Sequence, residues 1–189
     1  MGPSGCGKST LLYLRGGLDK PTKGSISIDG KDISCMKQKE KSLMRRRKIG
    51  FVFQFYNLVP NLSVEDNILL PLLIDGKKVK HLKNELAKIL DLIDMSARRK
   101  HILAELSGGQ QRVAIARALL FNPEIIFADE PTGNLDSKSG DDILELFRNI
   151  NKEYKKTIIQ VTHSEKVASF GTSILRMKDG EIESKQMII

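Results

Sequence analysis

Apolar residues recur along this chain in two alternating patterns. The short continuous apolar run over 125–128 is typical of a strand buried in a parallel sheet, and the mainly apolar stretches 49–53 and 157–161 also predict buried strands. Between them, apolar residues return at helical spacing over 82–93 and 143–150, which marks one buried face of a helix. Strands that alternate with helices predict an α/β fold, a layered structure with a mostly parallel central sheet.

Turn-forming residues delimit the shorter elements. A helix should run from Ser9 to Leu14 and end at Gly16-Gly17. The alternation at 25–28 before Asp29-Gly30 predicts a hairpin, and a second hairpin should surround Asp179-Gly180.

Two further helices complete the expected domain. One should run from Arg112 to Leu120, and the other should begin at a capping residue, Ser137, because serine side chains accept the free N–H groups of a first helical turn. We predict one domain over 1–189, with about 77–110 forming a charged, helical subdomain inserted in it.

Composition is that of a globular protein. Of the 189 residues, 40% are apolar and 29% are charged. The longest apolar run, Ile68–Ile74, contains Pro71 and is too short to span a bilayer. We expect no secretion leader and no myristoylation, because Cys6 stands where that motif has Ser or Thr. Cys6 and Cys35 are expected to be reduced thiols.

The charge balance is basic. The chain has 31 Lys and Arg against 23 Asp and Glu, a net charge of +8. That charge would suit nucleic acid, anionic lipid headgroups or nucleotide phosphates. Much of it lies in Lys37–Lys48, a run that we interpret as a solvated face because charge runs usually are.

The start of the chain carries a phosphate-binding motif. Gly2, Gly7, Lys8 and Ser9 fill every fixed position of G-x-x-x-x-G-K-[ST]. Glycines let backbone N–H groups curl around a phosphate, and the N-terminus of the following helix adds to the attraction. Lys8 can then reach the β- and γ-phosphates of a nucleotide, and the Ser9 hydroxyl can ligate Mg²⁺. The candidate nucleotide-binding residues of this loop are Gly2, Pro3, Ser4, Gly5, Cys6, Gly7, Lys8, Ser9 and Thr10.

An acidic pair follows the apolar run at 125–128. Asp129 would be delivered by a buried strand to the phosphates, where it can hold Mg²⁺. Glu130, one residue on, is suited to orient or deprotonate an attacking water. An acidic turn after a strand would contain the same residues, but the phosphate loop upstream favours the catalytic interpretation.

A second anion site is predicted at Leu106-Ser107-Gly108-Gly109-Gln110, directly before a helix that carries Arg112 and Arg117. A serine and two glycines at a helix N-terminus leave N–H groups and the helix dipole open to an anion. A plain helix start would use the same residue types. Two sites of this kind in one chain are expected where two chains share a nucleotide.

With these motifs the sequence resembles the ATP-binding-cassette (ABC) ATPases, since Leu106–Gln110 matches their signature motif in full. The resemblance covers essentially the whole chain and implies the ABC type of P-loop NTPase fold. It implies that Gln54 contacts Mg²⁺ and faces a transport partner, that Asn134-Leu135-Asp136 is the D-loop at a dimer seam, and that His163 contacts the γ-phosphate.

The resemblance also assigns roles to single residues. The implied catalytic residues are Glu130 and His163, and the implied metal ligands are Ser9, Gln54 and Asp129. His81 and His101 match no motif and are expected to be exposed.

Short stretches of sequence outside these motifs resemble one branch of the family. Gly17-Leu18-Asp19, the stretch 50–58 and the stretch 132–136 are similar to the lipoprotein-release and macrolide-export branch, although Gln111 replaces a charged residue often found there. The branch implies ATP and Mg²⁺ as cofactors, a head-to-tail dimer with a second copy, and an integral-membrane permease for lipoproteins, peptides or drugs. It implies a cytoplasmic location on the inner face of the plasma membrane. No nucleic-acid partner is expected.

The phosphate loop normally follows a strand, and only Met1 precedes it here. The resemblance implies a preceding strand and an aromatic residue that stacks on adenine, so we expect the N-terminal β-strands to be missing. Two other interpretations remain open: a regulatory cassette protein acting on ribosomes, on DNA or in division, and an inactive fragment with intact motifs.

Overall fold

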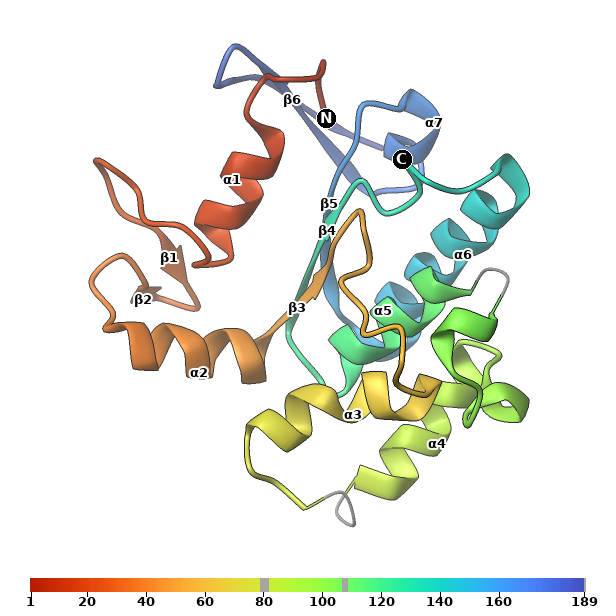
Figure 1. Cartoon of the computed structure of the whole chain (residues 1–189). Helices are drawn as coiled ribbons and strands as arrows, with labels where there is room; N and C mark the ends of the chain where they lie inside the picture. The colour runs from red at the N-terminus through yellow and green to blue at the C-terminus, as the bar shows by residue number, and fades with distance from the viewer. Residues whose placement is uncertain (79–81, 107–108, 189) are drawn as a thin grey trace.

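A three-stranded parallel sheet lies at the centre of the molecule (Figure 1). The computed structural model describes residues 1–78, 82–106 and 109–188. The strands β3 (Ile49–Val52), β4 (Ile125–Asp129) and β5 (Thr157–Val161) pair in the order β3-β4-β5. Ile49 lies opposite Ile125, which lies opposite Thr157, so the carboxyl ends of all three strands reach the same edge. This arrangement confirms the predicted α/β fold.

Two antiparallel hairpins flank the sheet. The first joins β1 (Ser27–Ile28) to β2 (Lys31–Asp32), and the second joins β6 (Ser173–Lys178) to β7 (Glu181–Met187). Both turns are the Asp-Gly pairs of the sequence pattern, and all four turn residues have positive φ, as the tightest hairpin turns require.

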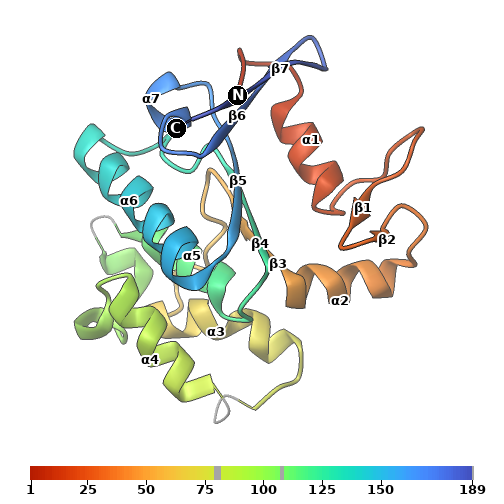
Figure 2. The ribbon, with the colours of Figure 1, turned by 180° about the vertical axis from the view of Figure 1, so that it is seen from behind.

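Helices cover both faces of the sheet. In both views α1 lies on one side of the strands, and α5 and α6 lie on the other (Figures 1 and 2). The described helices are α1 (Lys8–Arg15), α2 (Gln38–Lys48), α3 (Val64–Ile74), α4 (Lys83–Leu92), α5 (Gln110–Leu119), α6 (Ser137–Tyr154) and α7 (Glu165–Ala168), with short 3₁₀ turns η2 (Ser96–Arg98) and η3 (Leu103–Glu105). None of these helices is long and apolar enough to cross a membrane.

Successive side chains of β4 enter two different cores. Ile126 and Ala128 join a large cluster that includes the buried faces of α3, α4, α5 and α6. Phe127 points the other way, into a smaller cluster with Leu12 of α1 and Val161 of β5. Burial on both faces explains why this strand is a continuous apolar run, and the strand ends in Asp129, whose carboxylate contacts α1.

The expected cap of α6 was wrong by one residue. Asp136, not Ser137, is the N-cap, and its carboxylate accepts the backbone N–H groups of Lys138 and Ser139, both at 3.0 Å. A carboxylate satisfies two free N–H groups and also favours the positive end of the helix, so it displaces the neighbouring hydroxyl from this position.

The basic run at 37–48 is more than a solvated face, which corrects the sequence interpretation. It forms α2, in which the Lys41 side chain is buried. Arg46 and Arg47 of α2 donate to Asp75, the residue that ends α3, at 2.5 and 3.2 Å. The hydrogen bonds and charges of Arg46 and Arg47 hold the pKa of the Asp75 carboxyl below its usual range, and the bonds tie α2 to the end of α3. Lys77 forms a further ion pair with Asp75 at 3.6 Å.

Candidate functional site

The phosphate-binding motif forms a loop that ends at the N-terminus of α1. The last loop residue, Gly7, is the N-cap, with a left-handed φ of 91° and no side-chain cap. The first turn of α1 contains no acidic residue, so its backbone N–H groups and dipole face the loop without competition. This is the arrangement that binds phosphate groups.

Lys8 supplies a positive charge at the same point. The residue is the first of α1 and is only 7% exposed. Its Nζ donates to the carbonyl oxygen of Pro3 at 2.8 Å, so the ammonium group is folded back over the loop. A buried ammonium bonded to a neutral carbonyl attracts an anionic partner.

Asp129 ends β4 beside the same loop and is 6% exposed. Ser9 Oγ donates to its Oδ1 at 2.8 Å, and the Tyr13 hydroxyl donates to its Oδ2 at 2.7 Å. Burial, the bond to Asp129 and the charge of Asp129 raise the pKa of Tyr13 to about 12, so the phenol stays protonated and donates. The structure thus brings the predicted ligands Ser9 and Asp129 together from opposite parts of the chain.

Glu130 and His163 form a pair next to Asp129. Nδ1 of His163 lies 3.0 Å from Oε1 of Glu130, and the backbone N–H of Glu130 donates to the carbonyl of Val161, the last residue of β5, at 3.1 Å. Glu130 adopts a left-handed φ of 43°, an uncommon conformation for a glutamate. The parallel register brings the two residues to one edge, because each follows the carboxyl end of its strand.

Gln54 follows β3 at this edge and contacts the expected D-loop. Asn134 donates its side-chain Nδ2–H to the carbonyl oxygen of Gln54 at 2.9 Å. The turn after Gln54 is held from α5, because Arg117 donates to the carbonyl oxygens of Tyr56 and Asn57 at 2.6 and 2.5 Å. Both of those turn residues have positive φ, and burial lowers the pKa of Arg117.

The signature segment is described in part. Leu106 is buried, and Gly109 is the N-cap of α5 with a left-handed φ of 82° and no side-chain cap. Gln110 donates its Nε2–H to the carbonyl oxygen of Leu106 at 3.0 Å. Ser107 and Gly108 lie outside the described residues, as does His81, whereas His101 is exposed as expected.

The donor set beside α1 fits a hard cation. Ser9 and Asp129 offer oxygen atoms that already lie together, and oxygen donors are what Mg²⁺ prefers. No ion pair to Asp129 is formed within the described ranges, so its buried negative charge suits a bound cation. Mg²⁺ takes few protein ligands and completes its shell with phosphate oxygens and water, which agrees with this small set.

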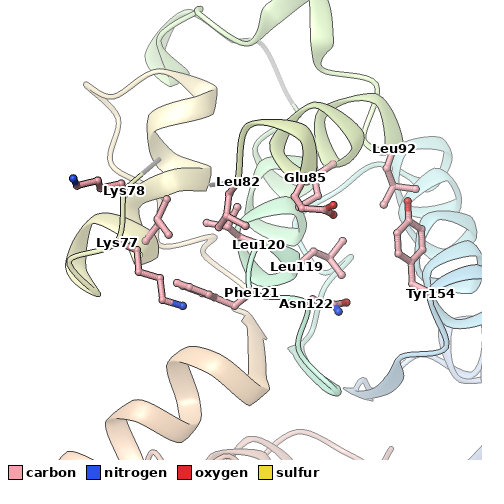
Figure 3. A pocket seen from close by; sticks show the side chains of 12 residues that line it. Lys77, Lys78, Leu82, Glu85, Leu92, Leu119, Leu120, Phe121, Asn122 and Tyr154 are labelled. Atoms are coloured by element: carbon pink, nitrogen blue, oxygen red, sulfur yellow. The ribbon is translucent and has the colours of Figure 1, made fainter. Parts of the chain in front are cut away.

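A cavity of about 720 Å³ lies away from this site, between α3, α4 and the ends of α5 and α6 (Figure 3). Leucines line much of it, and the Lys77 side chain reaches over the Phe121 ring, with Nζ 4.9 Å from the ring centroid. None of the predicted site residues lines it. The cavity therefore takes no part in the assignment of the nucleotide site.

Comparison with known proteins identifies the family. Residues 1–133 match the ABC transporter family. An uncharacterized ABC transporter ATP-binding protein of Thermotoga maritima is 50% identical over 184 residues, which are 97% of this chain and 78% of that protein. The chain belongs to the ABC transporter family.

Relatives within the ABC family come from the expected branch. The lipoprotein-releasing system ATP-binding protein LolD 1 of Chlorobium chlorochromatii is 44% identical over 96% of this chain and 74% of its own length. The macrolide export ATP-binding/permease protein MacB of Bdellovibrio bacteriovorus is 42% identical over the whole chain, which spans 29% of that protein.

The fold matches solved ABC structures over the whole of this chain. The ATP-binding cassette MJ0796, in a dimeric post-hydrolysis state bound to ADP and Pi, superposes with a TM-score of 0.88 at 43% identity and covers 100% of this chain and 84% of that one. The chain is accordingly a cassette of the ABC ATPase family.

The contacts of two residues beside the site were not predicted. Tyr13 contacts Asp129, and Arg117 holds the turn after Gln54. A local signal existed for Tyr13, because it lies four residues after Ser9 and therefore on the same face of the helix. No local signal existed for Arg117, whose partners lie 60 and 61 residues away.

Proposed function

We propose that Glu130 and His163 carry out ATP hydrolysis at the carboxyl edge of the sheet, with Ser9, Gln54 and Asp129 holding Mg²⁺. One observation carries the proposal: Lys8, the Ser9–Asp129 pair at 2.8 Å and the Glu130–His163 pair at 3.0 Å all converge at the start of α1 and the ends of β4 and β5. A phosphate cradle, a metal-binding pair and a base are the parts that phosphoryl transfer to water requires.

Each group has a distinct task in this mechanism. The loop at 2–10 and the N-terminus of α1 bind the β- and γ-phosphates, and Lys8 compensates their charge. Bound Mg²⁺ supplies further charge neutralisation. Glu130 accepts a proton from the water that attacks the γ-phosphorus, while the bond from that phosphorus to the β–γ bridging oxygen breaks. His163 holds the Glu130 carboxylate and contacts the γ-phosphate.

The second half of the ATP site comes, in this proposal, from another copy of the chain. The N-terminus of α5, with Gly109 in a left-handed conformation and no side-chain cap, is open to an anion but has no metal-binding pair beside it in the described residues. We assign the signature residues 106–110 to the γ-phosphate of ATP bound at the partner's phosphate loop. The dimeric state of the related cassette MJ0796 supports this arrangement.

The proposed partner of the dimer is an integral-membrane permease. A hollow of about 280 Å³ beside the Gln54 turn is lined in part by Phe53, Asn57 and Arg117, and Phe55, in the same turn, is 75% exposed. The names LolD and MacB of relatives support a permease for lipoproteins or drugs. The chain would then be peripheral on the inner face of the plasma membrane. We also propose that residues of about 77–110, which end in the signature segment, form a subdomain that moves with the permease.

Two measurements on the purified full chain test the proposal. Phosphate release from ATP should require Mg²⁺, and ATP without Mg²⁺ should shift the chain from monomer to dimer in size-exclusion chromatography with light scattering. The Glu130→Gln variant serves as control, because it should dimerise with ATP and release little phosphate. Failure of the parent chain to bind ATP or release phosphate would overturn the proposed function.

A further inference from the structure

The carboxylate of Asp129 is held from one helix by two hydroxyl groups. Ser9 Oγ bonds Oδ1 at 2.8 Å, and the Tyr13 hydroxyl bonds Oδ2 at 2.7 Å. The two donors are one helical turn apart in α1, so both hydroxyls meet the end of β4 from the same face. Ser9 belongs to the phosphate-binding motif, whereas Tyr13 lies outside it.

The bond from the Tyr13 hydroxyl gives a donor to Oδ2 of Asp129, a buried oxygen that would cost free energy if it had none. Asp129 is only 6% exposed, and a buried carboxylate oxygen without a donor loses its full solvation. Groups that bond the far side of a metal ligand also fix its orientation. Within the described residues the side-chain bonds to Asp129 come from Ser9 and Tyr13. Tyr13 is therefore the group that fixes the oxygen not paired with Ser9.

The Tyr13 ring is itself fixed by packing. Its centroid lies 6.4 Å from that of Phe53, which stacks on Phe51 at 5.6 Å. Phe51 in turn stacks on Phe127 of β4 at 5.6 Å. This row of rings connects the strand that ends in Asp129 to the helix that holds its carboxylate, and pairs of this kind prefer defined geometries.

We propose that Tyr13 is a positioning residue for metal–nucleotide binding: its hydroxyl holds Oδ2 of Asp129 and thereby keeps Oδ1 beside the Ser9 hydroxyl. The inference rests on the proposed function, since it assumes that Ser9 and Asp129 are metal ligands. It adds a residue from outside the motif to that site. The competing explanation is that Tyr13 only packs α1 against the sheet.

The Tyr13→Phe variant separates the two explanations, because phenylalanine keeps the ring and removes only the hydroxyl. Binding of a fluorescent ATP analogue is measured as Mg²⁺ is raised, without reference to hydrolysis. We expect the Mg²⁺ midpoint, the concentration that gives half-maximal enhancement of binding, to rise about 10-fold. This is the smaller end of the loss in metal affinity that follows when a group that bonds a metal ligand is removed. Affinity for the analogue without Mg²⁺ should change by less than about twofold, as for an independent site.

Two further variants serve as controls. Tyr154→Phe removes a hydroxyl at the distant cavity near Leu92 (Figure 3) and should leave the Mg²⁺ dependence unchanged. In the Asp129→Asn variant, adding Tyr13→Phe should not raise the Mg²⁺ midpoint any further, because Tyr13 acts only through the carboxylate of Asp129.

The outcomes are distinguishable. An unchanged or lowered Mg²⁺ midpoint in Tyr13→Phe, or additive losses in the double variant, would overturn the positioning role and leave the proposed function intact. A drop in thermal stability with an unchanged midpoint would likewise assign Tyr13 to packing alone. If the parent chain bound no nucleotide, both the proposed function and this inference would fail.

Discussion

The helices α1 and α5 begin alike and are surrounded differently. Each has a glycine N-cap in the left-handed conformation, Gly7 at φ 91° and Gly109 at φ 82°, and neither has a side-chain cap or an acidic residue in its first turn. The helices α3 and α6 have Ser63 and Asp136 as their N-caps, and the side chains of these residues accept free N–H groups of the first turn. The first pair keeps its N-termini open for an anion, and the second pair closes them.

What lies beside each open end separates α1 from α5. The start of α1 has Lys8 and the Ser9–Asp129 pair. On the opposite side of the sheet (Figure 1), the described start of α5 has a bond from Gln110 to Leu106, and Arg112 faces Asp142 at 3.7 Å. The start of α1 therefore has the parts of a phosphate site within the chain, whereas the start of α5 offers only part of one.

Lys8→Ala should have the largest effect, because it removes the charge that distinguishes α1 from α5. Loss of a buried cation that binds phosphate is expected to lower ATP affinity by roughly 100-fold or more. Isothermal titration of the full chain with ATP measures this loss. Near-parental affinity in Lys8→Ala would mean that the open helix end alone binds the phosphates, so Lys8 would not distinguish α1 from α5.

Glu130→Gln tests whether the chemistry, as well as binding, belongs to the α1 side. The amide keeps the size of the side chain and cannot accept the water's proton, so turnover should fall by about 100-fold or more. ATP affinity should persist, and the ATP-bound dimer should outlast that of the parent chain in size-exclusion chromatography. Turnover at the parental rate would show that Glu130 is not the base.

The matched pair Gly7→Ala and Gly109→Ala compares the two open ends directly. A Cβ at either position is strained by about 1–2 kcal/mol in the left-handed conformation, which corresponds to roughly 5- to 30-fold. A Cβ at Gly7 would lie 3.8 Å from Gly180 Cα, and one at Gly109 would meet the flexible Cε of Met95 at 2.4 Å, so neither is opposed by rigid backbone.

The readouts of the pair should differ. Gly7→Ala should weaken ATP binding to the isolated chain. Gly109→Ala should leave that binding unchanged and weaken ATP-dependent dimerisation and turnover, because its site acts on the partner's nucleotide. Equal loss of binding in both variants would show that α5 contributes to the site of its own chain.

Sequence reasoning succeeded where local pattern and burial agree. The run at 125–128 is apolar because β4 is covered on both faces. The carboxylate that ends it was placed at the nucleotide phosphates because the strand occurs together with the upstream phosphate loop. Both Asp-Gly hairpins were likewise predicted, because the turn needs residues that tolerate positive φ.

Prediction failed where stability depends on distant partners. The helix α2 has almost no apolar face, and its arginines are held by Asp75, 28 and 29 residues away. The bond from Tyr13 to Asp129 spans 116 residues, so only the i, i+4 relation to Ser9 could have suggested it. Asp136 replaced Ser137 as the cap of α6 because two adjacent capping residues compete, and the pattern does not rank them.

Ser63→Ala should have the smallest effect, and it tests a helix whose N-terminus is closed by a side-chain cap. The Ser63 hydroxyl accepts the backbone N–H of Asp66 at 3.1 Å, and its loss should lower the free energy of unfolding by about 1 kcal/mol. Urea denaturation should show a lower midpoint with an unchanged slope, and Ser63→Thr should recover most of the loss. ATP affinity should stay at the parental value, since this helix end binds its own cap and no ligand. A change in ATP affinity without a change in stability would contradict the assignment of capped helix ends to stability and of open helix ends to ligand binding.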